Sequence, residues 1–132
     1  MTFTPPNPYA DEAKQRWGHT DAYKQSQERV SKMTKEQFEA VGAQADAVTK
    51  QIAAAAEAGK APSDPEVLAL VAKHYTWLRS FYEPNLEMYR ALASMYVDDP
   101  RFAANYEKYR PGMAVYLRDA MHAYCDAEEA KS

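Results

Sequence analysis

The sequence predicts an all-α fold of six or seven helices, and three observations support this prediction. Apolar residues recur at spacings of three and four along most of the chain, which is the period of an amphipathic helix. Residues that start and stop helices stand between these runs. The chain has only four glycines, whereas alanine, glutamate, glutamine, lysine and methionine are common. No segment alternates convincingly at a period of two, so no sheet is expected.

A glycine corner separates two predicted short helices near the start of the chain. Residues 1–8 contain three prolines and are expected to form a loose, flexible arm. A helix is predicted over residues 9–17, and Gly18 stops it. Because Trp17 and Tyr23 flank this corner, it either wedges two helices together or forms the wall of a pocket.

The next two helices have clear capping residues. Thr20 or Asp21 starts a helix that runs to about residue 33, and Thr34 with Gln37 forms a capping box for the following one. Gly59 is placed to cap the end of this long helix. Its apolar stripe consists of Phe38, Val41, Ala45, Val48 and Ile52.

Proline, asparagine and aspartate residues mark the starts of the helices in the second half of the chain. Pro65 stands in the first turn of one helix, and Pro84 ends or kinks that helix. Each signal is followed by apolar residues at helical spacing. The signals are, in chain order, Ser63-Asp64-Pro65, Pro84-Asn85, Asp98-Asp99-Pro100 and Pro111-Gly112.

Composition and charge argue against several classes of protein. The net charge of -3 and the dispersed basic residues argue against binding of nucleic acid or of an anionic membrane by this chain. No apolar stretch approaches the ~20 residues of a membrane helix, and the N-terminus lacks the regions of a signal peptide. The single cysteine, Cys125, fits a reducing cytoplasm, so a cytoplasmic location is expected.

No motif for catalysis, cofactor binding or metal binding is found. The sequence has no Walker loop, no glycine-rich dinucleotide turn and no metal-ligand spacing, and its three histidines are far apart. We therefore expect no enzyme activity, no cofactor and no metal. Cys125 has no basic neighbour that would make it a thiolate, and it is interpreted as a bystander.

Aromatic residues are the unusual feature of the composition, with ten Tyr, four Phe and two Trp. Tyrosine hydroxyls need hydrogen-bond partners. The excess therefore indicates a ligand cleft, a tyrosine-rich protein interface, or packed rings whose hydroxyls reach water. His74 lies on an apolar stripe one turn from Trp77. It is either a buried histidine with one hydrogen bond or a polar fixing point in a mostly apolar pocket.

Two blocks of sequence together resemble a known family. The first block is EAKQRWGHTDAY, residues 12–23, with Ser26 three residues on. The second block contains HYTWL (74–78), EMYRAL (87–92), MYVDDPRF (95–102) and PGMAVYLRDA (111–120). In order and spacing they resemble the TipAS antibiotic-recognition domain over nearly the whole chain, from about Tyr9 to Tyr124.

The resemblance implies a compact, globin-like domain that binds bulky, flat, hydrophobic antibiotics such as thiopeptides. In that family the domain usually follows a DNA-binding module and coiled coil of the MerR type. The helices before the central long one close over the ligand, which would make the Trp17-Gly18 corner a lid hinge. No such module precedes the domain in this sequence, so we expect either a piece of a regulator or a freestanding form that sequesters the drug.

One family feature is missing from this chain. Some members capture their ligand through a cysteine on the helix after the His-Trp segment. Residues 82–97 contain no cysteine here, and Pro84 and Ala91 stand near the expected position. This departure from the family pattern therefore predicts noncovalent binding.

These observations predict a non-enzymatic ligand-binding domain over residues 9–126, with a tail at residues 127–132. It binds a bulky aromatic or peptide-like antibiotic between the first two helices and the helix pair of residues 74–96, in drug sensing or sequestration. Stacking is expected from Trp17, Trp77, Phe81 and Tyr89, and hydrogen bonds from His74, Tyr82 and Tyr96. The full set of expected contacts adds Tyr23, Met95 and Phe102. The alternative is a protein-interaction or dimerisation module with the same aromatic surface, and the oligomeric state stays open.

Overall fold

The computed structural model describes residues 18–131, and every regular element in this range is a helix. This confirms the all-α prediction. The helix expected over residues 9–17 lies outside the described residues. The elements are α2 (Asp21–Ser31), α3 (Lys35–Glu57), α4 (Pro65–Trp77), the 3-10 helix η1 (Leu78–Ser80), α5 (Leu86–Asp98), α6 (Pro100–Glu107) and α7 (Met113–Ala130).

The predicted caps start the helices where the sequence places them. The Thr34 hydroxyl accepts from the Gln37 N–H at 3.1 Å, and the Gln37 side chain accepts from the Thr34 N–H at 2.9 Å, which completes the capping box. Asp64, Asn85 and Asp99 each accept a backbone N–H in the first turn of α4, α5 and α6.

The helix ends follow from backbone constraints. Gly59 after α3 and Gly112 before α7 both have φ of 81°, a conformation that other residues adopt only with strain. Helix α4 ends at Trp77, and a 3-10 turn continues to Ser80, so the chain leaves the helix before Pro84. Helix α7 continues through Ala130, so most of the expected tail at residues 127–132 is helical.

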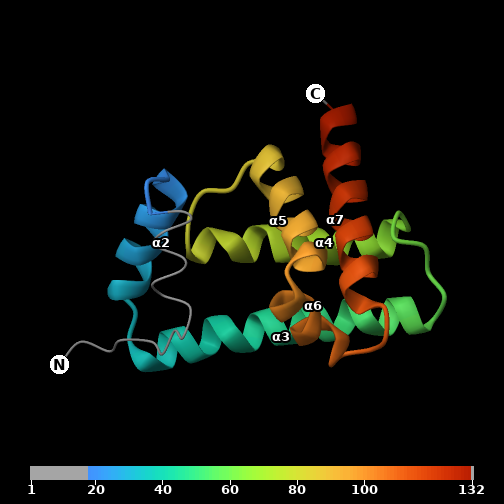
Figure 1. The fold of residues 1–132 in the computed structure, drawn as a ribbon, viewed down its shortest axis with the longest axis horizontal. Coiled ribbons are helices and arrows are strands. Elements are labelled where there is room, and N and C mark those ends of the chain that lie inside the picture. The colour runs from blue at the N-terminus through green and yellow to red at the C-terminus, as the bar shows by residue number, and fades with distance from the viewer. Residues whose placement is uncertain (1–17, 132) are drawn as a thin grey trace.

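Helices α3 and α4 form an antiparallel pair along the long axis of the molecule (Figure 1). Helix α7 packs against both helices of this pair, and α5 and α6 pack against α7 and against each other. Helix α2 stands apart, at the end where α3 begins and α4 ends (Figure 1). It contributes no buried residue.

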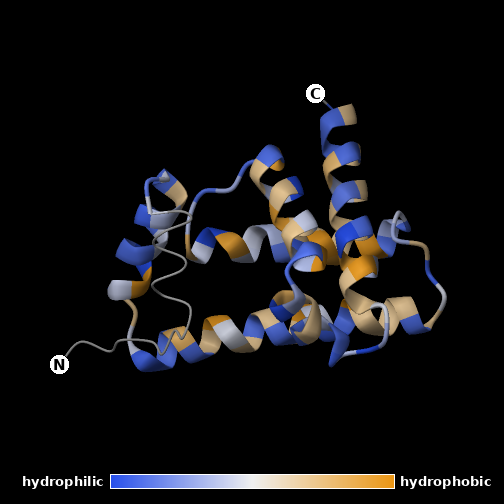
Figure 2. Ribbon diagram, in the orientation of Figure 1, coloured by the Kyte–Doolittle hydropathy of each residue, from blue (hydrophilic) through white to orange (hydrophobic). Residues whose placement is uncertain are grey.

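The hydrophobic core lies where α3, α4, α5 and α7 meet, and the hydrophobic ribbon segments gather there in Figure 2. The largest of its fully buried side chains is Tyr89. The others are Ile52, Met113, Leu117, Met121, Val67, Val71 and Cys125. The burial of Cys125 agrees with its interpretation as a bystander. None of the described helices is long and apolar enough to cross a membrane.

The stability of this core should be sensitive to α7. Replacing Leu117, which is 1% exposed, by alanine should lower the free energy of unfolding by about 3 kcal/mol, because it leaves a cavity. Val115→Ala on the same helix is the control, because Val115 is 43% exposed, and it should change stability by less than about 0.5 kcal/mol. Urea denaturation followed by circular dichroism measures both, and equal losses would contradict the assigned core face of α7.

Candidate functional site

A cavity of about 420 Å³ lies between α2 and α5, with Tyr82 at its edge. This size is within the range of small-molecule sites in proteins. Its walls are mostly apolar, and the polar atoms come from hydroxyl groups and backbone. The lining residues are Thr20, Ala22, Tyr23, Ser26, Tyr82, Met88, Ala91, Leu92 and Met95.

Helix α2 is tied to the rest of the fold by polar contacts at the segment after α4. The Gln25 side chain accepts from the Glu83 N–H at 2.9 Å. The Arg29 guanidinium donates to the Arg79 carbonyl and lies 3.5 Å from the Glu83 carboxylate. Exposed contacts of this kind each contribute at most about 1 kcal/mol. The helix that covers the cavity is therefore held more weakly than the core beneath it.

Helix α5 has two apolar faces. Tyr89, Ala93 and Tyr96 are buried in the core. Met88 and Leu92 face the cavity and are only half-buried. The helix therefore forms the floor of the cavity while its opposite side is fixed by the core.

The core face of α5 is anchored by a buried histidine. His74 is 4% exposed, and its Nδ1 forms a hydrogen bond of 2.6 Å with the Tyr89 hydroxyl. Burial lowers the pKa of His74 to about 4 and raises the pKa of Tyr89 well above its usual value, so both groups are neutral at pH 7. The His74 ring stacks on Trp77 with centroids 5.5 Å apart, and Trp77 Nε1 donates to the Val41 carbonyl at 2.9 Å. This chain of contacts links α3, α4 and α5.

A second group of rings closes the core at the end of α5. Tyr96 packs on Tyr106 at 4.7 Å and on Phe102 at 6.0 Å between ring centroids. Burial raises the pKa of the Tyr96 hydroxyl well above its usual value. These rings join α5 to α6.

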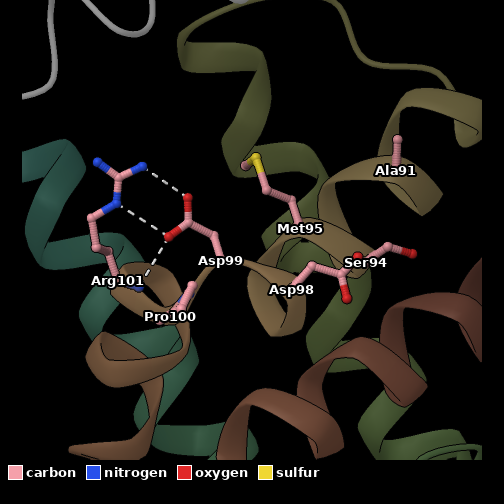
Figure 3. Close-up of a pocket in the computed structure, with 7 residues that line it drawn as sticks. All are labelled: Ala91, Ser94, Met95, Asp98, Asp99, Pro100 and Arg101. Carbon is pink, nitrogen blue, oxygen red and sulfur yellow. Dashed lines mark hydrogen bonds and ion pairs between the residues drawn. The ribbon is translucent and has the colours of Figure 1, made fainter.

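A recess of about 690 Å³ lies beside the cavity, at the corner between α5 and α6 (Figure 3). Unlike the cavity, it carries charged side chains. Its lining residues are Ala91, Ser94, Met95, Asp98, Asp99, Pro100 and Arg101.

The structure brings three of the predicted contact residues to the cavity: Tyr23, Tyr82 and Met95. Trp17 lies outside the described residues. The remaining six do not line the cavity. His74, Tyr89 and Tyr96 are buried, Trp77 and Phe102 are half-buried against the core, and Phe81 is half-buried against Trp77. The physical reason is that most of these rings supply core volume where α4, α5 and α6 meet, so they face inward and do not line the cavity.

Sequence reasoning missed six lining residues: Thr20, Ala22, Ser26, Met88, Ala91 and Leu92. For most of these residues, the spacing along the sequence indicates that they share one helix face with a predicted contact residue. Ser26 follows Tyr23 by three residues, and Met88, Ala91, Leu92 and Met95 recur at three and four along α5. The expected contacts were mostly aromatic residues, so this second apolar stripe on α5 was not predicted as a binding surface.

Exposure speaks against the alternative of an aromatic interaction surface. Among the large hydrophobic side chains of residues 18–131, the exposed one is Val115, which is not aromatic. In the same range no group of three or more His, Cys, Asp or Glu residues is arranged to hold a metal ion.

An apolar cavity covered by a weakly held helix defines a helical ligand-binding domain. The sequence matches the family model of the TipAS antibiotic-recognition domain over residues 9–124. The chain therefore belongs to the TipAS antibiotic-recognition domain family.

Two transcriptional activators with similar sequences support this assignment. The chain is 38% identical over 120 residues to the HTH-type transcriptional activator TipA of Streptomyces coelicolor, covering 89% of this chain and 47% of TipA. It is 30% identical over 122 residues to the HTH-type transcriptional activator mta of Bacillus subtilis, covering 92% of this chain and 46% of mta. The chain thus spans about half the length of these relatives.

A solved structure has the same fold. It is TipAS of Streptomyces lividans in complex with nosiheptide, from a thiopeptide antibiotic multidrug resistance system. The TM-score is 0.87 at 34% identity, and the match covers 95% of this chain and 88% of that one.

The buried His74 should make the fold less stable in mild acid. Its pKa is about 4 in the folded chain against an ordinary value of 6.5, so below pH 6.5 the unfolded chain binds a proton that the folded chain does not. The free energy of unfolding should fall as the pH drops from 6.5 to 4, by about 2 kcal/mol between pH 7 and pH 5. Urea denaturation at the two pH values measures it.

Two variants test whether His74 causes this pH dependence of the free energy of unfolding. His74→Gln should lose the contribution, because no imidazole remains to bind the proton. His19→Gln removes an exposed imidazole and should keep the pH dependence. An unchanged fall in stability in H74Q would show that another group is responsible.

The polar contacts of α2 should control how often it opens. Arg29→Ala removes the contacts to Arg79 and Glu83, and amide hydrogen exchange in α2 should become up to about fivefold faster, with the urea midpoint of the core unchanged. Lys32→Ala is the control, because Lys32, the residue that follows α2, pairs with Glu28 of α2 rather than with the segment after α4. Equal exchange rates in the two variants would contradict this role of Arg29.

Proposed function

We propose that this chain binds a bulky aromatic or peptide-like antibiotic, noncovalently, in the cavity between α2 and α5. The observation that carries this proposal is the cavity itself: two tyrosines, two methionines and a leucine surround it, in a domain of an antibiotic-recognition family. Tyr23 and Tyr82 offer flat ring faces for a planar ligand. Ser26 offers a hydroxyl group that fixes its orientation.

Noncovalent binding follows from the position of the one cysteine. Cys125 is fully buried on α7, and burial raises the pKa of its thiol, which disfavours the nucleophilic thiolate. Ala91 occupies the cavity wall near the position where the family resemblance places a capturing cysteine. An alanine there leaves space for the ligand and offers no nucleophile.

The cavity is suited to binding rather than to catalysis. Its described lining has no histidine, carboxylate or thiol, so none of these lining residues can act as a general base toward the Ser26 hydroxyl. We infer a recognition role, in drug sensing when joined to a regulator or in sequestration when acting alone. Sequestration is tested by adding the purified protein to a thiopeptide-sensitive culture, where the inhibitory concentration of nosiheptide should rise in proportion to the protein added.

The direct test is titration with nosiheptide, followed by tryptophan emission and thermal melting. At a ligand concentration of 100 times Kd, binding should add about 2.7 kcal/mol of stability. Intact mass after denaturation should equal that of the unmodified chain, because binding is noncovalent. An unchanged emission and melting temperature with nosiheptide and with a panel of other flat antibiotics would overturn the proposal.

Filling the cavity should abolish this binding. Ala91→Phe places a ring at an exposed position that lines the cavity, and nosiheptide affinity should fall at least about tenfold because the ring takes the ligand's space. Ala104→Phe is the control at an exposed position on α6 that lines neither the cavity nor the recess. Equal affinity in both variants would place the ligand elsewhere.

A further inference from the structure

The recess at the α5–α6 corner adjoins the cavity. Ala91 and Met95 line both spaces, and they lie one turn apart on α5. Ala91 is small and exposed, so it adds little bulk where the two linings meet. A molecule held in the cavity can therefore extend along α5 into the recess.

Two of the charged groups in the recess serve the fold. The Asp99 carboxylate caps α6 by accepting from the Arg101 N–H at 3.0 Å. The Arg101 guanidinium donates to both oxygens of the same carboxylate, at 3.2 Å and 3.0 Å (Figure 3). This pair is bidentate, and its two charges offset each other.

Ser94 and Asp98 have no such structural task. They lie one turn apart on α5 and beside each other on the recess wall (Figure 3). Neither side chain forms a hydrogen bond or ion pair with a residue in the described part of the chain. Among the described residues, the recess therefore presents the negative charge of Asp98 without a cationic partner and the Ser94 hydroxyl as an acceptor.

We infer that the ligand of this domain carries an arm ending in a protonated amine, which reaches Asp98 and Ser94 while its ring system lies in the cavity. This inference rests on the proposed binding of an aromatic molecule between α2 and α5. An ammonium group has three donors and no acceptor, which matches a carboxylate and a hydroxyl acceptor. A carboxylate arm is repelled by Asp98, since Arg101 is engaged with Asp99. The cavity recognises shape, and the recess selects charge.

The experiment uses three probes that share a naphthalene ring and a four-carbon chain, ending in an ammonium, a hydroxyl or a carboxylate group. Dissociation constants are measured by NMR titration at low ionic strength, where screening is weak. The ammonium probe should bind about fivefold more tightly than the hydroxyl probe, as expected for a partly exposed ion pair. The carboxylate probe should bind most weakly.

Two variants of α5 localise the effect. Asp98→Asn should lower the affinity of the ammonium probe to that of the hydroxyl probe and leave the latter unchanged. Glu87→Gln removes an exposed negative charge from the same helix but lines neither space, so the preference should persist. Circular dichroism and thermal melting establish that both variants are folded.

The outcomes separate the two proposals. Equal binding of all three probes, or a charge preference that survives in D98N, would overturn the amine arm and leave antibiotic binding in the cavity intact. Failure of nosiheptide, of the wider antibiotic panel and of all three probes to bind would overturn the proposed function, and with it this inference.

Discussion

The arrangement of the domain depends on one constraint, which is that α5 is apolar on two sides. Tyr89, Ala93 and Tyr96 are held in the core by α4 and α7, so α5 cannot rotate to bury its other side. That side, with Met88 and Leu92, needs cover from another element, and α2 supplies it. Because α2 contributes no buried residue, the cover is loose and a cavity remains. The candidate site thus exists because the second apolar side of α5 is only partly buried, while its first side is fixed in the core.

The energetic contrast between the two faces of α5 explains how the site can be both positioned and accessible. The core face includes a buried hydrogen bond between His74 and Tyr89, and breaking it would leave buried polar atoms without partners. The cavity face is covered through exposed contacts of Gln25 and Arg29, which water can replace at small cost. Opening of α2 therefore requires far less free energy than unfolding of the core. The methionine side chains on the cavity face can repack around ligands of different outline.

Most of the fold was readable from local sequence, and only part of the site was. Thr34 with Gln37, Asp64, Asn85 and Asp99 are local signals, because a cap involves residues two or three apart, and the structure forms each of them. A 3.6-residue period of apolar residues shows that a residue lies on the apolar face of a helix, but it does not show which element covers that face. This is why Tyr89 and Tyr96 were expected at the ligand and lie in the core. The pairing of α5 with α2 joins segments about 65 residues apart in sequence, and no local pattern reports it.

The core and the cavity use tyrosine in different ways, and this difference bears on recognition. In the core, each hydroxyl needs a protein partner, as Tyr89 has in His74, and these pairs fix the geometry of α5. At the cavity, Tyr23 and Tyr82 keep part of their surface accessible, so they can exchange water for a ligand at little conformational cost. Selectivity in such a cavity comes from shape, since its described lining carries no charge. Among the described lining residues of the two spaces, the charged groups lie in the recess, where Asp98 stands beside a carboxylate and guanidinium paired with each other. In the proposed site, shape and charge are therefore read at neighbouring places along one helix, and Ala91 and Met95 belong to both.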